Sequence, residues 1–249
     1  MMDLRGYEPT ENLFKDRVIL VTGATSGIGR AISRDLIIHG ATVILHGRDE
    51  HSLEMLFQEF RELGPEPVVA QLDFALTQNN AYQKFAEELG SQFNKLDGLV
   101  HNAGMLGART PIEHYDINLW QKVIQTNLSA PFALTQYLLP LLRLSEDASV
   151  LFTTSSVGNY GRAYWGAYCV SKFGIEGLAQ MLADELGDTR IRVNCINPGG
   201  IRTKMRQAAY PTEDPNTLPL PETITGPYLY LLGPDSRGTT RKRINVKSE

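Results

Sequence analysis

The feature that most restricts the fold of this chain is a regular alternation of short apolar runs with longer stretches of helical periodicity. The runs are rich in β-branched residues and lie at 17–21, 41–45, 67–71, 96–100, 149–153 and 191–196. Strands that are apolar along nearly their whole length are typical of a parallel sheet whose two faces are both covered by helices. The alternation therefore predicts an α/β fold with a doubly wound parallel sheet of about seven strands, the last near 242–246.

The segments between these runs predict the helices of the two covering layers, at 28–39, 50–63, 79–93, 117–142 and 165–186. Pro140 is expected to limit the fourth helix, because proline has no backbone N–H to donate. The 249 residues contain no repeat or long linker, so we expect one domain over 1–249 with an N-terminal extension at 1–16. The least regular part, 210–227, contains five prolines and is either a cap over a site or a plain surface connection.

Composition argues against several classes of function. The net charge of −4 offers no basic surface for nucleic acid, and no apolar run approaches the length of a membrane-spanning helix. The N-terminus lacks the apolar core of a signal peptide, and the five histidines show no spacing typical of a metal site. Cys169 and Cys195 are expected to be thiols in a reducing compartment. We therefore expect a cytoplasmic protein without a metal, a membrane partner or a nucleic-acid partner.

A glycine-rich segment, Thr-Gly-Ala-Thr-Ser-Gly-Ile-Gly at 22–29, joins the first predicted strand to the first predicted helix. Glycines permit a tight turn there and let the backbone approach a pyrophosphate, while the helix N-terminus offers free N–H groups. The segment predicts a dinucleotide site, and the alternative is a glycine turn without a ligand. The expected contacts are Gly23, Thr25, Ser26, Gly27, Ile28 and Gly29.

The end of the second predicted strand distinguishes the two nicotinamide dinucleotides. A carboxylate at this point would bind the ribose 2′-hydroxyl of NAD and repel the 2′-phosphate of NADP. This chain has Gly47 and then Arg48, whose guanidinium suits a phosphate. The sequence therefore favours NADP(H) over NAD, with a solvated turn residue as the alternative interpretation of Arg48.

Further motifs follow in a fixed order along the chain. They are His-Asn-Ala-Gly at 101–104, Asn127, Ser155, Tyr-x-x-x-Lys at 168–172 and Pro-Gly-Gly-Ile-Arg-Thr at 198–203. Together with the glycine segment, this set resembles the short-chain dehydrogenase/reductase family over nearly the whole chain. Three segments, LHNAG, WGAY and RVNCINPGG, are similar to the YciK-type bacterial oxidoreductases of that family.

The resemblance implies a Rossmann fold and a hydride transfer between a nicotinamide and a carbonyl or alcohol substrate. It also implies further contacts with the cofactor: Asp73, Asn102, Ala103, Gly104, Tyr168, Lys172, Pro198, Gly199, Ile201 and Thr203. For Asp73, which follows the third predicted strand, formation of a turn is the alternative role. The segment 204–227 is expected to select the substrate, which the sequence does not identify.

Tyr168 and Lys172 lie on one face of a predicted helix, because residues four apart are neighbours on a helix surface. An ammonium close to a phenol favours the phenolate, so Lys172 is expected to lower the pKa of Tyr168 and make it a general acid and base. Ser155 is expected to hydrogen-bond the reacting oxygen. The resemblance adds that Lys172 binds the nicotinamide ribose and that Asn127 holds a water in a proton relay.

Four neighbouring residues are interpreted more plainly. His101 is expected to be structural at a strand end, and Cys169 to face away from the site. Tyr164 and Trp165 either line the substrate site or pack against other residues. These positions carry no catalytic role in the interpretation.

The C-terminus departs from the family pattern, because no Asp-Gly-Gly element follows the last predicted strand before Glu249. In relatives that element helps to build one subunit contact, so its absence puts a homotetramer in doubt more than the chemistry. The two long helices commonly form a dimer face in the family, and we expect at least a homodimer. Two other functions are weighed: a dinucleotide sensor without catalysis, and a nucleotide-sugar epimerase, which usually needs a longer chain.

Overall fold

The computed structural model describes residues 4–76 and 79–246, and these contain a sheet of seven strands in the order β3-β2-β1-β4-β5-β6-β7. Every neighbouring pair is parallel, which confirms the doubly wound sheet. The predicted strands are all present, with ends shifted by at most two residues. Their bounds are β1 Val18–Thr22, β2 Thr42–Gly47, β3 Val68–Gln71, β4 Gly98–His101, β5 Ala148–Thr153, β6 Ile191–Asn197 and β7 Lys242–Asn245.

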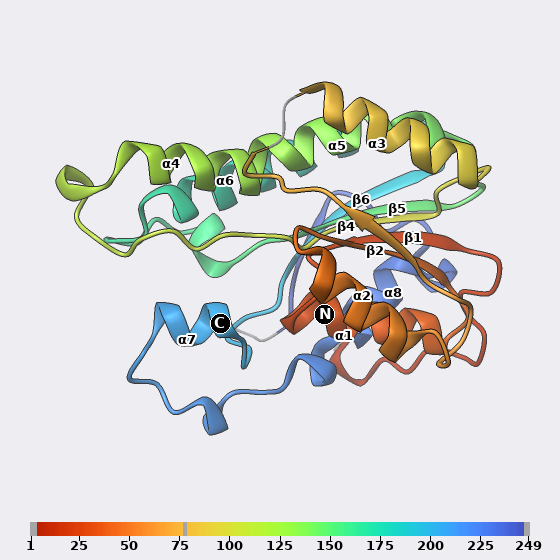
Figure 1. Ribbon diagram of the computed structural model, residues 1–249, viewed down its shortest axis with the longest axis horizontal. Helices are drawn as coiled ribbons and strands as arrows, with labels where there is room; N and C mark the ends of the chain where they lie inside the picture. Colours follow the sequence, from red (N-terminus) through yellow and green to blue (C-terminus); the bar gives the residue numbers. More distant parts are fainter. Residues whose placement is uncertain (1–3, 77–78, 247–249) are drawn as a thin grey trace.

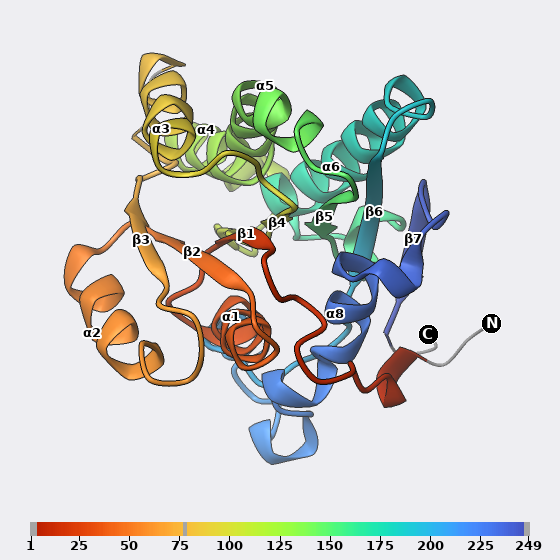
Figure 2. The same cartoon turned by 90° about the vertical axis from the view of Figure 1, so that its right-hand side faces the viewer.

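Helices cover both faces of the sheet, as Figures 1 and 2 show. One layer contains α1 (Gly27–Ile38), α2 (Glu50–Phe60) and α8 (Gly226–Leu232). The opposite layer contains α3 (Asn79–Gln92), α4 (Ile117–Ile124), α5 (Ala130–Arg143) and α6 (Gly166–Glu185). Each layer buries its own apolar cluster against the sheet, so the strands are apolar on both sides, as their sequences indicated.

The fourth predicted helix differs from a regular α-helix in two places. Between α4 and α5 lies a π-helical turn, Gln125–Ser129, so that Asn127 sits in a widened turn. Pro140 lies inside the last turn of the helix, which ends at Arg143, one residue past the predicted end. The buried side chains of Leu138 and Leu142 on either side of the proline keep this last turn packed against the core.

The segment 204–227, which contains the irregular region 210–227, has more structure than expected. It includes α7 (Lys204–Ala209), two short 3-10 turns at Pro215–Thr217 and Pro221–Ile224, and the start of α8. Sequence periodicity missed α7 and α8, because six and seven residues among prolines are too few to show a helical repeat. Figure 1 shows α7 and the chain that follows it standing out from the layer that contains α1.

We propose that the chain is one domain, because a single sheet takes strands from residue 18 to residue 245. The predicted N-terminal extension, 1–16, packs onto this domain through Phe14, which is fully buried, and through the Tyr7 hydroxyl, which donates to Asp235. Residues 1–3 of the extension, and 77, 78 and 247–249 of the predicted domain, lie outside the described residues.

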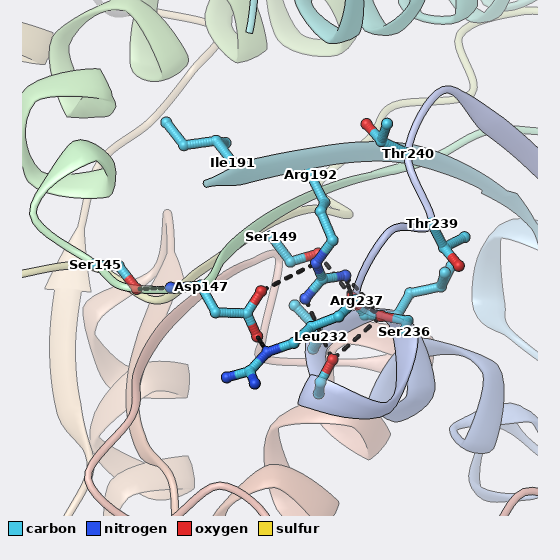
Figure 3. A network of polar contacts seen from close by, with 12 residues as sticks. Ser145, Asp147, Ser149, Ile191, Arg192, Leu232, Ser236, Arg237, Thr239 and Thr240 are labelled. Atoms are coloured by element: carbon cyan, nitrogen blue, oxygen red, sulfur yellow. Dashed lines mark hydrogen bonds and ion pairs between the residues drawn. The ribbon is translucent and has the colours of Figure 1, made fainter. Parts of the chain in front are cut away.

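The amino ends of the central strands are joined by a buried network of charges around Asp147 (Figure 3). Its carboxylate pairs with Arg192 at 3.1 Å, Arg17 at 3.4 Å and Arg237 at 3.6 Å. Arg192 also donates to the carbonyl of Leu231 at 2.7 Å. The network ties β1, β5 and β6 to the end of α8, which leaves the carboxyl ends of the strands free to form a site.

Candidate active site

A cavity of about 460 Å³ opens at the carboxyl edge of the sheet, where ligands bind in open α/β folds. It is lined from several elements: the loop after β1, the ends of β4, β5 and β6, the first turns of α6, and α7. Thirteen of the residues expected to contact a cofactor line it: Gly23, Ser26, Gly27, Ile28, Asn102, Ala103, Gly104, Tyr168, Lys172, Pro198, Gly199, Ile201 and Thr203.

The glycine loop is tightly packed against the end of β4. Gly23 has φ +67°, and a Cβ atom there would lie 2.9 Å from the Cα of Ala103. The Thr22 hydroxyl accepts from the backbone N–H of Asn102 at 2.9 Å and of Ala103 at 3.0 Å. The side chain of Asn102 donates back to the Thr22 carbonyl at 3.2 Å. The loop therefore holds a fixed shape in which only glycine fits at position 23.

The first turn of α1 faces this cavity without a side-chain cap. Ser26 occupies the N-cap position in an extended conformation, and its hydroxyl makes no capping hydrogen bond to the described residues. Gly27 follows with φ +54° and lines the cavity. The uncapped N–H groups and the positive end of the helix dipole suit a phosphate, so this cradle fits the pyrophosphate of a dinucleotide.

Four expected cofactor contacts do not line the cavity: Thr25, Gly29, Arg48 and Asp73. Gly29 supports the loop from behind, since a Cβ there would lie 2.3 Å from the Gly23 carbonyl oxygen. The Asp73 carboxylate accepts from the backbone N–H of Ala75 at 2.9 Å, which is the turn-forming role given as its alternative.

Gly47 and Arg48 lie at the end of β2, where the sequence placed the choice between NADP and NAD. A Cβ at Gly47 would lie 2.9 Å from the Thr25 methyl group and 3.2 Å from Leu53, so this position has little room for a carboxylate. Arg48 is exposed, and its carbonyl accepts from the Gln71 side chain at 3.1 Å. This contact fixes the backbone of Arg48 at the end of β2, beside the position of Gly47.

Tyr168, Ser155 and Lys172 line the same cavity and are brought together by α6 and the end of β5. The Lys172 ammonium donates to the Thr153 carbonyl at 2.7 Å and lies 5.6 Å from the centre of the Tyr168 ring. Burial lowers the pKa of Lys172 to about 8, and Cys195 and Glu176 oppose this shift. At neutral pH the lysine therefore remains charged.

The pKa of Tyr168 moves in the direction opposite to the sequence-based expectation. Burial raises it to about 12, and only the hydrogen bond with Ser155 acts to lower it. The expected lowering by Lys172 is not found, because the phenol is buried and the ammonium is directed to the Thr153 carbonyl. In this state Tyr168 is a neutral phenol, a form that can donate a proton.

Asn127 lies beside the cavity but does not line it. Its side-chain oxygen accepts from the Met105 N–H at 2.7 Å, and its amide donates to the Met105 carbonyl at 2.9 Å and to the Ser171 hydroxyl at 3.0 Å. The side chain thus ties the loop after β4 to α6, next to Lys172. Asn127 itself lies in the π-helical turn between α4 and α5, which presents its side chain to these partners.

An apolar wall closes the side of the cavity near Tyr168. Trp165 packs against Tyr168 at 5.7 Å and against Tyr210 at 5.9 Å between ring centres. Leu106, Met205 and Ala209 complete it. Of the two aromatic residues weighed in the sequence, Trp165 lines the cavity, whereas Tyr164 is 58% exposed and does not.

Sequence reasoning missed most of this wall, together with other cavity residues. Those at strand ends could have been found by extending the motifs: Thr153, Thr154 and Asn197. Seven others lie in the segment 204–227, which the sequence assigned to substrate selection without singling out residues: Lys204, Met205, Arg206, Ala209, Tyr210, Pro221 and Glu222. Arg202 lies inside the motif at 198–203, and only Arg30 and Leu106 come from positions without a pattern that signals a site.

The plainer interpretations of neighbouring residues are confirmed. His101 ends β4, shares a hydrogen bond with Thr135 at 2.8 Å and stacks on Phe152, and burial lowers its pKa to about 3. The Cys169 thiol donates to the Val157 carbonyl, away from the cavity.

Among the described residues, no cluster of His, Cys, Asp or Glu could hold a metal ion, and no helix is both long and apolar enough to span a bilayer.

Comparisons with known proteins show which family the chain belongs to. A family model described as short chain dehydrogenase matches residues 17–214. The oxidoreductase YciK of Escherichia coli K12 is 48% identical over 94% of this chain and 93% of its own. A short chain dehydrogenase structure from Shigella flexneri superposes with a TM-score of 0.95 at 46% identity, covering 98% of this chain and 96% of its own.

A third relative is described with a nucleotide. A short chain dehydrogenase from E. coli CFT073, solved in complex with NADPH, superposes with a TM-score of 0.94 at 47% identity and covers 96% of this chain and 100% of its own. The family match extends over strands β1 to β6, the glycine loop and the Tyr168–Lys172 helix. The chain therefore belongs to the short-chain dehydrogenase/reductase family of oxidoreductases.

Proposed function

We propose that this chain is an NADP(H)-dependent oxidoreductase that interconverts a carbonyl compound and its alcohol. The observation that carries the proposal is that Tyr168, Ser155 and Lys172 line the same cavity as the uncapped glycine loop. A relative solved in complex with NADPH supports the choice of cofactor. Arg48, at the end of β2, is proposed to meet the 2′-phosphate.

The residues of the cavity divide between cofactor and substrate. The glycine loop and the first turn of α1 would hold the pyrophosphate, and Lys172 the ribose of the nicotinamide half. When bound, the nicotinamide supplies a hydride to the carbonyl carbon. Asn102, Ala103, Gly104, Pro198, Gly199, Ile201 and Thr203 would contact the remainder of the cofactor.

Tyr168 would donate its phenolic proton to the carbonyl oxygen as that oxygen gains negative charge. Ser155, which is hydrogen-bonded to Tyr168, would also donate to the reacting oxygen and fix its position. The charged Lys172 would stabilise the phenolate that remains once its ammonium, which is 5.6 Å from the ring centre, turns from the Thr153 carbonyl toward Tyr168. Reoxidation of the alcohol follows the same path in reverse.

Asn127 is proposed to serve the proton supply that restores Tyr168. It contacts Ser171, the residue next to Lys172, and its widened turn disrupts the regular helical bonding around it. A water bound at this turn would connect Lys172 to solvent. The structure gives Asn127 a supporting contact here, and its role in the relay rests on the family.

The apolar wall favours a substrate with a hydrophobic group next to its carbonyl. Trp165, Leu106 and Met205 present apolar surface on the side of the cavity near Tyr168. Charged side chains also line the cavity here, because Lys204 and Arg206 flank Met205 on α7 and the Arg206 guanidinium lies 3.9 Å from the centre of the Tyr210 ring. An aryl ketone or a branched aliphatic ketone would fill this wall. The segment 204–227 is proposed to select among such compounds.

A protein that only binds the dinucleotide is the competing function. It would keep the glycine loop without needing Tyr168 and Ser155 in the cavity. We further propose a homodimer formed through the long helices, and a reducing cytoplasmic setting, which suits the two free thiols Cys169 and Cys195.

Titration with NADPH and, separately, with NADH, followed by nicotinamide fluorescence, tests the cofactor assignment first. Turnover of 1-phenylpropane-1,2-dione with NADPH then tests the reaction. Tighter binding of NADPH together with turnover supports the proposal. Tight binding with no turnover of any aryl or branched aliphatic ketone would favour the binding-only protein.

A further inference from the structure

A buried carboxylate lies directly behind the catalytic residues, outside the cavity. Glu176 stands on α6 one helical turn after Lys172 and is 8% exposed. Its Oε1 atom accepts from the Thr154 hydroxyl at 2.7 Å and from Nε of Arg243 at 2.9 Å. The surroundings are tight: a Cβ at Gly158 would lie 2.8 Å from the same oxygen.

Arg243 links Glu176 to the loop that contains Ser155. It lies on β7, 88 residues from Ser155 in sequence, and its Nη2 donates to the Ser155 carbonyl at 3.2 Å. The Lys172 ammonium holds the Thr153 carbonyl two residues earlier, at 2.7 Å. The segment 153–155 is therefore fixed by charged side chains from both α6 and β7.

The charge of Glu176 also reaches Lys172. The groups facing that ammonium are Tyr168 and Glu176 from its own helix, Cys195 from β6 and His101 from β4. His101 is neutral because burial lowers its pKa to about 3, and burial raises the pKa of Cys195 to about 12, so its thiol is neutral too. Glu176 is thus the negative group among them, although Arg243 partly offsets its charge.

We propose that Glu176 and Arg243 are positioning residues for the reaction: together they fix the Ser155 loop, and Glu176 places a negative charge one helical turn from Lys172. The inference rests on the proposed function. It also assigns the last strand a part in the chemistry, whereas the sequence connected the C-terminus only with subunit contacts. Neither residue lines the cavity, so neither is expected to touch the substrate.

Glu176→Gln is the informative variant, because the amide keeps an oxygen for Thr154 but loses the charge. We expect kcat for 1-phenylpropane-1,2-dione to fall by roughly tenfold to a hundredfold, since small misplacements of reacting groups cost that much. KM for NADPH should change little. The alkaline limb of the pH profile should move to lower pH, because the pKa of Lys172 falls when the negative charge is removed.

Asp184→Asn is the matched control. Asp184 lies on the same helix, far from Lys172, and pairs at 2.6 Å with Arg241, which precedes β7. Both side chains of this pair are exposed. The control also exchanges a carboxylate for an amide. It should leave kcat and the pH profile unchanged.

Arg243→Lys separates the two roles and serves if Glu176→Gln does not fold. Lysine keeps a charge for Glu176 but has a single nitrogen, so it cannot also hold the Ser155 carbonyl in the same geometry. We expect a lower kcat with the alkaline limb unmoved. Thermal unfolding of each variant shows whether it is folded at the assay temperature.

A direct measurement distinguishes failure of this inference from failure of the proposed function. The pKa of Lys172 is followed by NMR in protein labelled with ¹³C-lysine, with Lys172→Met to assign the signal. A lower pKa in Glu176→Gln supports the charge role even if no ketone is turned over. An unchanged pKa, or an unchanged kcat and pH limb in a folded variant, overturns the inference and leaves Glu176 and Arg243 as an ordinary buried ion pair.

Discussion

The two ends of the sheet bury polar groups in opposite ways. At the amino end, Asp147 pairs with three arginines, and Arg192 donates its other N–H groups to carbonyls and a hydroxyl of the same chain. At the carboxyl end, Tyr168 and Lys172 are just as buried, but they face a cavity, and burial moves both pKa values against the charged form. At the amino end the charges are paired with one another within the chain, whereas at the carboxyl end the two groups line a cavity.

We therefore expect substitutions at the amino end of the sheet to lower stability and substitutions at the carboxyl end to lower activity. Removing one partner from a satisfied buried network leaves the others charged and unpaired. Removing a group from the cavity takes away an interaction that only the bound reactants use, and such sites are often held at some expense of stability.

The largest effect is expected for Tyr168→Phe at the carboxyl end. Loss of the proton donor should reduce kcat by at least about a thousandfold, within the range that general acids contribute. The affinity for NADPH and the unfolding midpoint should stay close to those of the wild type. Steady-state turnover and fluorescence titration measure these quantities, and substantial remaining turnover would remove Tyr168 from its role.

At the amino end, Asp147→Ala should lower the free energy of unfolding by about 3–5 kcal/mol, as for other buried pairs that lose one partner. Arg17 and Arg192 would then be left buried without their carboxylate. The protein that remains folded at low temperature should keep the wild-type KM for NADPH. Urea unfolding checks the first statement, and Glu146→Ala, whose exposed partner is Arg190, is the control with little expected loss.

Arg48→Ala should weaken NADPH binding by about tenfold to a hundredfold, because hydrogen bonds to a charged group contribute about 1.5–3 kcal/mol. NADH lacks the 2′-phosphate, so its affinity should hardly change. The backbone contact with Gln71 uses the carbonyl of residue 48 and survives the substitution. Equal losses for the two nucleotides would refute the assignment.

The rate of ketone reduction should fall as pH rises through about 8, the pKa of Lys172. The active form carries the charged lysine, so the rate is full below this pKa and lost above it. Tyr168, with a pKa of about 12, stays protonated across this window and adds no second limb there. A pH profile of kcat with NADPH measures the limb, and a flat profile from pH 7 to 10 would contradict the role of Lys172.

The smallest effect concerns stability at the carboxyl end. The folded-state pKa of Lys172, about 8, lies below its ordinary 10.5, so the charged lysine weakens the fold at neutral pH. The penalty shrinks as pH rises from about 8 and is gone only above 10.5. Lys172→Met should therefore raise the unfolding midpoint at pH 7 by a few degrees, about 2–4 °C per kcal/mol in a chain of this size. Calorimetry at pH 7 and pH 10 checks it: the gain should shrink at the higher pH.

The sheet and the glycine loop could be predicted because their signals are local. Apolar runs, a glycine segment between a strand and a helix, and Tyr168 four residues before Lys172 can each be recognised within a short window. The apolar wall could not, since Leu106, Trp165 and Met205 meet only through the fold. The raised pKa of Tyr168 was missed for the same reason: the depth of burial and the direction of the Lys172 ammonium are tertiary properties.

The bonds between Thr22, Asn102 and Ala103 have a consequence for the speed and heat of cofactor binding. Because the loop is already ordered, it loses little conformational entropy when the dinucleotide binds. Association should therefore be a single rapid step without a slow ordering phase. The amide hydrogens of Asn102 and Ala103 should exchange slowly with solvent even in the free protein. The substitution Thr22→Val would remove the hydrogen bonds to the Thr22 hydroxyl, so the loop would no longer be ordered before binding. Association should then occur in two steps, binding and ordering.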